Sequence, residues 1–268
     1  MKRLTDVGYW DKHWWGPASP QRLRFLYRDV DLEFVRLIRK LAGRADCRTL
    51  EAGAGGSRIL PYLARKYGYQ TVGTDFSHLG CRLLQANFAL ADATGGVICE
   101  DLFASSLRPE IFDLVFSFGL IEHFDDTRAV VSEHLRWVRP GGWLVLTVPN
   151  LEGWNGRLMK KLAPPHWSRH KVLSRRQLAD MLKSLGLERV RTGCLGSFYL
   201  QIGTDAGWTG LEQWPRLARK LAPHLLRVAN GLLSLFFRLL PVRPHFQMTS
   251  PTLFAVGRKQ STDNRSSP

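Results

Sequence analysis

Residues 49–60 read TLEAGAGGSRIL, and this stretch decides the fold of the chain. Apolar residues lead into Glu51, glycines follow at Gly53, Gly55 and Gly56, and a second apolar run comes next. Glycine contributes no side chain to packing and costs backbone entropy, so a cluster of glycines between two apolar runs needs a reason. The pattern predicts a tight turn at which the backbone lies against a ligand.

Around this turn, apolar segments rich in β-forming residues alternate with helical ones. The alternation predicts crossover connections and a parallel sheet covered on both faces, which is the α/β class. The glycine stretch falls between the first strand and the first helix, at the edge of a doubly wound sheet where ligands bind. Strands are expected at 48–52, 70–74, 96–100, 112–118, 143–148, 189–194 and 252–256, and helices at 57–68, 77–93 and 125–139.

The composition indicates a soluble globular chain. It has 268 residues, of which 44% are hydrophobic and 23% are charged. No apolar run approaches the roughly 18 residues of a membrane span, and the N-terminus lacks the apolar core of a signal peptide. The four cysteines have no C-x-x-C spacing, which is typical of reduced thiols and predicts no zinc site. A cytoplasmic location is therefore expected.

The glycine cluster does not fit two common phosphate-binding patterns. Counting from Gly53, G-x-G-x-x-G needs a glycine where the chain has Arg58, and no Gly-Lys pair is present for a Walker loop. Glu51 instead offers a carboxylate to a cationic amino group. Asp75 ends the second strand, where a carboxylate can bind ribose hydroxyls, and Asp101 follows the third strand, where it can accept from an adenine amino group. Together they predict a ligand that joins an amino acid to a nucleoside.

The segments LEAGAGGS, VGTDFS, CEDLF, FDLVFSFGLIEHF and VRPGGWLVLTVPN resemble the motifs of class I S-adenosylmethionine-dependent methyltransferases. The resemblance covers roughly residues 45–195 and implies S-adenosyl-L-methionine as cofactor. It implies a Rossmann-like, doubly wound, mostly parallel seven-stranded sheet with an antiparallel last strand. The residues that it assigns to the cofactor are Glu51, Gly53, Gly55, Gly56, Asp75, Phe76, Asp101, Leu102, Ser117 and Gly119.

Within this class the chain resembles the ubiquinone-biosynthesis O-methyltransferase group. The arm HWWGPASPQRLRFL and the segment after the fifth strand, which contains His170, are similar to that group. The group carries E-x-x-E-H after the fourth strand as metal ligands. Here Gly119 stands at the first Glu position, which leaves only Glu122 and His123, so no metal is predicted.

A hydroxyl acceptor also needs a base that takes its proton. His123 is the first candidate, because it follows the fourth strand and its unperturbed pKa is suitable. The alternative is a structural histidine that is hydrogen-bonded to a loop. His170 is the second catalytic candidate, and Trp14, Trp15 and His166 are assigned to the substrate side. The sequence PPHW around His166 is a poor helix former, which disfavours a metal pair with His170.

About fifty residues separate the sixth and seventh strands, where the class usually has a short hairpin. Residues 216–244 carry six Lys and Arg and no acid. On a helix, Arg227, Asn230, Ser234 and Arg238 form one polar stripe and apolar residues cover the rest. This apolar face is too wide for an ordinary surface helix. The segment is also too short and too interrupted to span a bilayer.

Two interpretations of residues 216–244 remain open. They form a lid or dimer helix packed on the domain, or an interfacial helix lying on an anionic membrane. The net charge of +15 and the pI near 10.2 are compatible with a membrane surface, with nucleic acid or with solubility alone. Nucleic acid is disfavoured because the chain has no appended RNA-binding module and no N-P-P-Y motif for a flipped base. A cytoplasmic protein, peripheral on the inner face of the membrane, fits the second interpretation.

The predicted function is methyl transfer to a small, apolar or lipid-linked acceptor, with O-methylation favoured. The alternatives are an N-methyltransferase of a lipid headgroup or natural product, an RNA methyltransferase, and a non-catalytic membrane-docked binding protein of the same fold. The expected organisation is an N-terminal helical arm or cofactor lid (1–44), the methyltransferase domain (45–198 and 250–259), a basic helical insertion (199–249) and a disordered tail (260–268).

Overall fold

A computed structural model describes residues 1–14, 20–23, 25, 29–200, 209–240 and 246–261. The predictions for Trp15 and for residues 262–268 of the tail lie outside these residues. One seven-stranded sheet has the order β3-β2-β1-β4-β5-β7-β6. Its strands are β1 (Arg48–Ala52), β2 (Gln70–Asp75), β3 (Gly96–Cys99), β4 (Phe112–Phe118), β5 (Val138–Pro149), β6 (Glu188–Leu195) and β7 (Thr252–Arg258).

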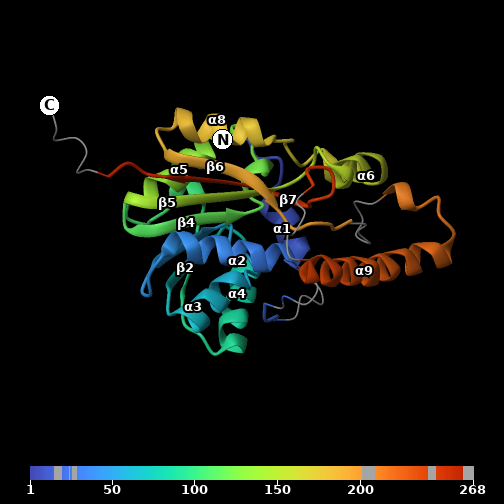
Figure 1. The fold of residues 1–268 in the computed structure, drawn as a ribbon, viewed down its shortest axis with the longest axis horizontal. Helices are drawn as coiled ribbons and strands as arrows, with labels where there is room; N and C mark the ends of the chain where they lie inside the picture. The colour runs from blue at the N-terminus through green and yellow to red at the C-terminus, as the bar shows by residue number, and fades with distance from the viewer. Residues whose placement is uncertain (15–19, 24, 26–28, 201–208, 241–245, 262–268) are drawn as a thin grey trace.

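The predicted fold class is confirmed. Neighbouring strands from β3 to β5 pair in parallel, and β7 pairs antiparallel with both β5 and β6. Helices cover both faces of the sheet (Figure 1). They are α1 (Val7–Trp14), α2 (Asp29–Ala42), α3 (Ile59–Tyr67), α4 (His78–Ala91), α5 (Thr127–Trp137), α6 (Trp154–Leu162), α7 (Pro164–Trp167), α8 (Arg175–Ser184) and α9 (Arg216–Leu239), with short 3₁₀ turns η1 (Leu102–Ala104), η2 (Ile121–His123) and η3 (Thr209–Leu211).

The central strand β4 is buried on both of its faces, which explains why its sequence shows no alternation of polar and apolar residues. Leu114, Val115 and Phe116 are all fully buried. Leu114 and Phe116 pack into the apolar cluster beneath α2, α3 and α4, while Val115 points to the cluster beneath α5 and α8. Each face of the strand therefore meets a helical layer, and both sets of side chains must be apolar.

Most predicted bounds lie within about two residues of the observed ones, and two local details differ more. Strand β5 begins at Val138 rather than at 143, because the register with β4 is irregular there and takes up Pro140 and Gly141. Gly141 has φ +73°, a left-handed conformation that glycine adopts without strain. The segment PPHW, expected to be a poor helix, forms the four-residue α7 with proline in its first turn, where a missing N–H costs nothing.

The region around α9 is helical, as expected for an insertion between β6 and β7. The 24-residue helix lies beside the sheet domain and extends away from it (Figure 1). It ends at Leu239, and residues 241–245 of the predicted segment lie outside the described part. Among the described helices, none is long and apolar enough to cross a membrane.

Candidate cofactor and acceptor site

The glycine stretch forms the tight turn that was predicted, between β1 and α3. Gly53 and Gly56 have φ +69° and +62°, which side-chain-bearing residues rarely adopt. Gly55 is required for a different reason. A Cβ atom at Gly55 would lie 2.9 Å from Asp75 Oδ2, so only glycine lets the turn approach the end of β2.

The turn borders a cavity of about 350 Å³ at the carboxyl ends of β1, β2 and β4. This size lies within the range of small-molecule sites. Eight predicted site residues line its wall: Trp14, Glu51, Gly53, Gly55, Gly56, Asp75, Phe76 and Gly119. The wall also includes Phe118, which lies between the predicted residues Ser117 and Gly119. It is completed by residues that sequence reasoning did not assign: Trp10, His13, Asp31, Ser57, Arg58, Ile59 and Leu120.

Asp75 is held rigidly at the end of β2. Its Oδ2 accepts a hydrogen bond from the Gly55 amide at 2.8 Å, and its Oδ1 accepts one from the Ser77 amide at 2.8 Å. Burial raises the pKa of this carboxyl above its usual value. The two hydrogen bonds fix the carboxylate on the cavity wall, where it can accept further bonds from a ligand.

Glu51 is a buried acid on the same wall. It is 3% exposed, and Ser57 Oγ donates a hydrogen bond to its Oε2 at 2.5 Å. Burial raises the pKa of Glu51 to about 8. A cationic group in the cavity would favour the ionised form and offset the cost of its burial. The carboxyl therefore fits a ligand that carries an ammonium group.

Asp101 stands outside the cavity wall and already has a partner. Both of its oxygens accept from Arg3 Nη2 at 2.6 Å, and Oδ1 accepts from the Phe103 amide at 2.9 Å. The Arg3 guanidinium also lies over the Phe76 ring, 5.0 Å from its centroid. Arg3 thus covers the acid that the resemblance assigns to the adenine.

Substituting Arg3 tests this arrangement. If the adenine amino group donates to Asp101, the Arg3 pair must first break. Because a partly exposed ion pair contributes up to about 1 kcal/mol, Arg3→Ala is expected to tighten S-adenosylmethionine binding up to about fivefold in calorimetry. Lys2→Ala, which removes the neighbouring exposed pair with Asp125, is the control. Weaker binding by Arg3→Ala would show that Arg3 holds the ligand instead of competing with it.

Two other predicted cofactor residues do not reach the cavity. Leu102 is buried in η1, directly after Asp101. Ser117 is fully buried in β4, and its carbonyl oxygen accepts from Thr147 Oγ1 at 3.3 Å. The residues that follow Ser117, Phe118 and Gly119, line the wall instead.

Asp31 and Arg58 line the cavity, but no sequence pattern indicated that they would. Asp31 is 2% exposed at the start of α2, and its carboxylate lies 3.7 Å from the Arg58 guanidinium. An acid in the first turn of a helix is ordinarily a capping residue. Asp31 faces the cavity only because α2 packs beside the glycine turn.

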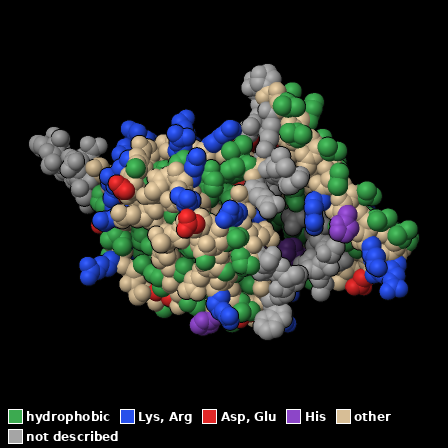
Figure 2. Space-filling model, turned by 90° about the horizontal axis from the view of Figure 1, so that it is seen from below, with side chains coloured by type: hydrophobic (Ala, Val, Ile, Leu, Met, Phe, Trp, Pro, Cys, Tyr) green, Lys and Arg blue, Asp and Glu red, His purple; other side chains and the backbone are tan. Residues whose placement is uncertain are grey.

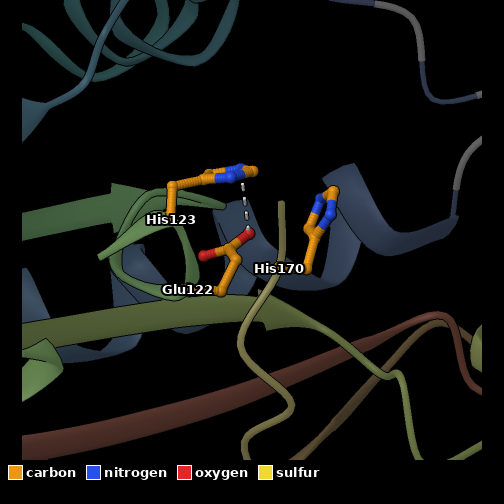
Figure 3. A group of neighbouring side chains, drawn as sticks. All are labelled: Glu122, His123 and His170. Carbon is orange, nitrogen blue, oxygen red and sulfur yellow. Dashed lines mark ion pairs between the residues drawn. The ribbon is translucent and has the colours of Figure 1, made fainter. Parts of the chain in front are cut away.

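A second group of side chains lies next to the cavity. Glu122 and His123 come from η2, after β4, and His170 comes from the segment after α7 (Figure 3). One ligand atom from each residue lies within 4.8 Å of the others. The Lys171 amide donates to the Glu122 carbonyl at 2.7 Å, which holds the two segments together. Neither histidine lines the cavity, and Trp10 links them to it through an edge contact with His123, at 5.1 Å between centroids.

The environment of this group changes the expectation for His123. Burial lowers the pKa of His123 to about 3 and that of His170 to about 4, and it raises the pKa of Glu122 to about 8. His123 does not keep the unperturbed pKa that the sequence suggested, because its ring has lost solvent. The third predicted histidine, His166, has its ring 4.8 Å from that of His170 and its Nδ1 3.3 Å from the Tyr9 hydroxyl.

The sheet order, the glycine turn and the acids that end β1 and β2 define the class I methyltransferase fold. Residues 50–146, about a third of the chain, match the family model described as a methyltransferase domain. That region runs from β1 into β5 and contains the glycine turn, Asp75 and η2.

Curated relatives agree with this assignment at low identity. The chain is 27% identical over 153 residues to a ubiquinone biosynthesis O-methyltransferase from Leptothrix cholodnii, covering 56% of this chain and 63% of the relative. It is 28% identical over 178 residues to a probable S-adenosylmethionine-dependent methyltransferase from Mycolicibacterium smegmatis, covering 65% and 63%. The matches thus span less than two thirds of either relative.

Among solved structures, a similar fold is that of phosphoethanolamine N-methyltransferase 2 from Haemonchus contortus in complex with S-adenosyl-L-methionine. The TM-score is 0.58 at 17% identity, and the match covers 96% of this chain and 58% of that chain. At this identity the likeness establishes the fold alone.

Proposed function

We propose that this chain transfers a methyl group from S-adenosylmethionine to a small apolar acceptor, with a hydroxyl oxygen as the favoured methyl acceptor. One observation carries the proposal: a single cavity brings together the glycine turn, the buried acid Glu51 and the fixed carboxylate of Asp75. This set matches a ligand with an ammonium group at one end and ribose hydroxyls near the other. The curated relatives named above support the same reaction class.

Each residue then has a defined task. S-adenosylmethionine supplies a methyl carbon that is activated by the positively charged sulfur. Glu51 binds the ammonium group, and Asp75 accepts from the ribose hydroxyls. Trp10 and Trp14 from α1 line the cavity and exclude water, which favours transfer to the acceptor over hydrolysis.

The acceptor side lies toward Glu122, His123 and His170. A hydroxyl must lose its proton as its oxygen attacks the methyl carbon. His123 Nδ1 lies 2.8 Å from the Arg169 carbonyl and His170 Nδ1 lies 2.8 Å from the His166 carbonyl, so both Nδ1 atoms carry the proton. Each Nε2 therefore has a free lone pair. Amine methylation is the alternative. A neutral amine attacks the methyl carbon through its own lone pair, so it depends less than a hydroxyl on a base such as His123 or His170.

The first test is calorimetric titration of the purified protein with S-adenosylmethionine and S-adenosylhomocysteine. Micromolar binding at one site per chain is expected. Incubation with methyl-labelled cofactor and phenolic, quinol or amine acceptors then identifies the methylated atom. Label on nitrogen alone would replace O-methylation with the N-methyltransferase alternative. Absence of binding by well-folded protein would contradict the proposed function.

We also propose that the acceptor is lipid-linked and that α9 docks on an anionic membrane. The polar residues Asn230 and Ser234 are each 2% exposed and face the protein, and Asn230 pairs with the backbone of Leu200 in both directions. The apolar side of the helix faces outward and gathers along its outer edge (Figure 2). The exposed residues are Leu217, Leu221, Leu225, Val228, Leu232, Leu235, Phe236 and Leu239.

This orientation reverses that of an ordinary surface helix, which buries its apolar face. The exposed stripe recurs at three- and four-residue spacing, and Arg216, Arg219, Lys220 and Arg227 lie exposed on the same helix. The helix contains no acid. Apolar side chains flanked by cations suit an interface with anionic headgroups, where the helix lies in the plane of the membrane.

A further inference from the structure

The three side chains Glu122, His123 and His170 have the geometry of a metal-binding set. His123 Nε2 lies 3.8 Å from Glu122 Oε1, too far for a hydrogen bond. Figure 3 shows the carboxylate of Glu122 directed toward the His123 ring, with the His170 ring standing beside both. Because the three ligand atoms lie within 4.8 Å of one another, small rotations of the side chains would bring them around one ion.

Surrounding backbone groups orient both imidazoles for this role. The Nδ1 atoms of His123 and His170 donate to carbonyl oxygens at 2.8 Å, which leaves Nε2 as the acceptor atom on each ring. Histidines that bind metals are typically fixed by such a hydrogen bond at the other nitrogen.

An unpartnered atom is the second, independent observation. Glu122 is 2% exposed, and its Oε2 has no hydrogen-bond partner among the described residues. A buried polar atom without a partner costs about 1–3 kcal/mol, and more when it is charged. A bound cation would remove this cost by coordinating the carboxylate.

The donor set disagrees with Mg²⁺, the ion implied by the E-x-x-E-H motif of the resembled group. Mg²⁺ prefers oxygen ligands in octahedral geometry, and the first glutamate of that motif is Gly119 here. A Cβ atom at Gly119 would lie 3.3 Å from Glu122 Oε1, so a side chain at this position would begin beside the same group. His170 provides an imidazole from another segment instead. One carboxylate and two imidazoles suit zinc and neighbouring transition metals.

We propose that Glu122, His123 and His170 bind one divalent transition-metal ion of the zinc type, with an open coordination position for the acceptor hydroxyl. The position of this site beside Trp10 and Gly119, both on the cavity wall, connects it to the methyl-donor cavity. The acceptor role rests on the proposed function. Binding of the ion does not, because it depends only on the three ligands.

Metal titration of the full chain, stripped with a chelator, tests the site. Zn²⁺ is expected to bind at one equivalent with submicromolar affinity, and Mg²⁺ not to bind at millimolar concentration. His170→Ala is expected to weaken the Zn²⁺ affinity at least about 100-fold, since two ligands remain of three. Co²⁺ in place of Zn²⁺ is expected to give a visible absorption band in the wild type that is lost in His170→Ala.

The matched control variant disrupts a different pair of potential metal ligands, Cys99 and His78. Cys99 Sγ lies 3.5 Å from His78 Nδ1 on the exposed surface, and Cys99→Ser is expected to leave Zn²⁺ binding unchanged. The proposal is overturned if Cys99→Ser abolishes binding, if His170→Ala retains it, or if no Zn²⁺ binds. Circular dichroism checks that each variant is folded, and Glu122→Gln provides a second ligand variant.

Titration with S-adenosylmethionine, run on the same samples, separates the two proposals. Cofactor binding without Zn²⁺ binding would overturn the metal site and leave the proposed function intact. Zn²⁺ binding without cofactor binding would overturn the proposed function and leave the metal site intact. His170→Ala is expected to keep wild-type cofactor affinity, because His170 does not line the cofactor cavity.

Discussion

Asp75→Ala is expected to weaken S-adenosylmethionine binding at least about 100-fold, a loss of about 2.7 kcal/mol. The carboxylate would accept two hydrogen bonds from ribose hydroxyls, and hydrogen bonds to charged groups contribute about 1.5–3 kcal/mol each. The same change removes the acceptors for the Gly55 and Ser77 amides, so the glycine turn also loses its anchor. Calorimetric titration measures the affinity directly.

Two further variants make this measurement specific. Asp180→Ala changes an acid of α8 whose side chain is 63% exposed, and it is expected to bind the cofactor as the wild type does. Asp75→Asn keeps the shape of the side chain and removes its charge, so an intermediate affinity is expected. Binding by Asp75→Ala within threefold of the wild type would remove Asp75 from the site.

Replacing Leu225, Leu232 and Phe236 with serine is expected to abolish sedimentation with anionic vesicles. These side chains are 66%, 64% and 55% exposed on the apolar stripe of α9. Burial of a large apolar side chain contributes about 1.5–3 kcal/mol, so three substitutions should lower vesicle affinity by at least about 100-fold. Binding by the wild type should also weaken at high salt and on neutral vesicles.

The control for this experiment is Leu90→Ser, which changes a leucine of α4 that is 38% exposed and lies outside the stripe of α9. It is expected to sediment with vesicles as the wild type does. If the wild type elutes as a dimer and does not sediment with vesicles, and the triple variant elutes as a monomer, α9 is a dimer interface. Unchanged vesicle sedimentation of the triple variant would exclude the stripe as the membrane contact.

Sequence patterns predicted the elements well where local chemistry fixes them. The unbroken apolar run of β4 meets helices on both faces, and the glycines at 53 and 56 have the positive φ that their cluster implied. The position of Asp75 on the cavity wall was predicted for the same reason, because the carboxyl ends of parallel strands meet at one edge of the sheet. Asp101 follows the neighbouring strand β3, yet its carboxylate is bound by Arg3, from 98 positions away.

The sequence by itself determined the alternation of strands and helices, the glycine turn and the acids at the ends of β1 and β2. These features depend on residues close together in the chain, which share one backbone geometry. Tertiary structure alone decided that His170 meets Glu122 and His123 and that α9 turns its leucines outward. Periodicity defines two faces of a helix but not which one is buried, because burial depends on contacts with distant segments such as that between Asn230 and Leu200.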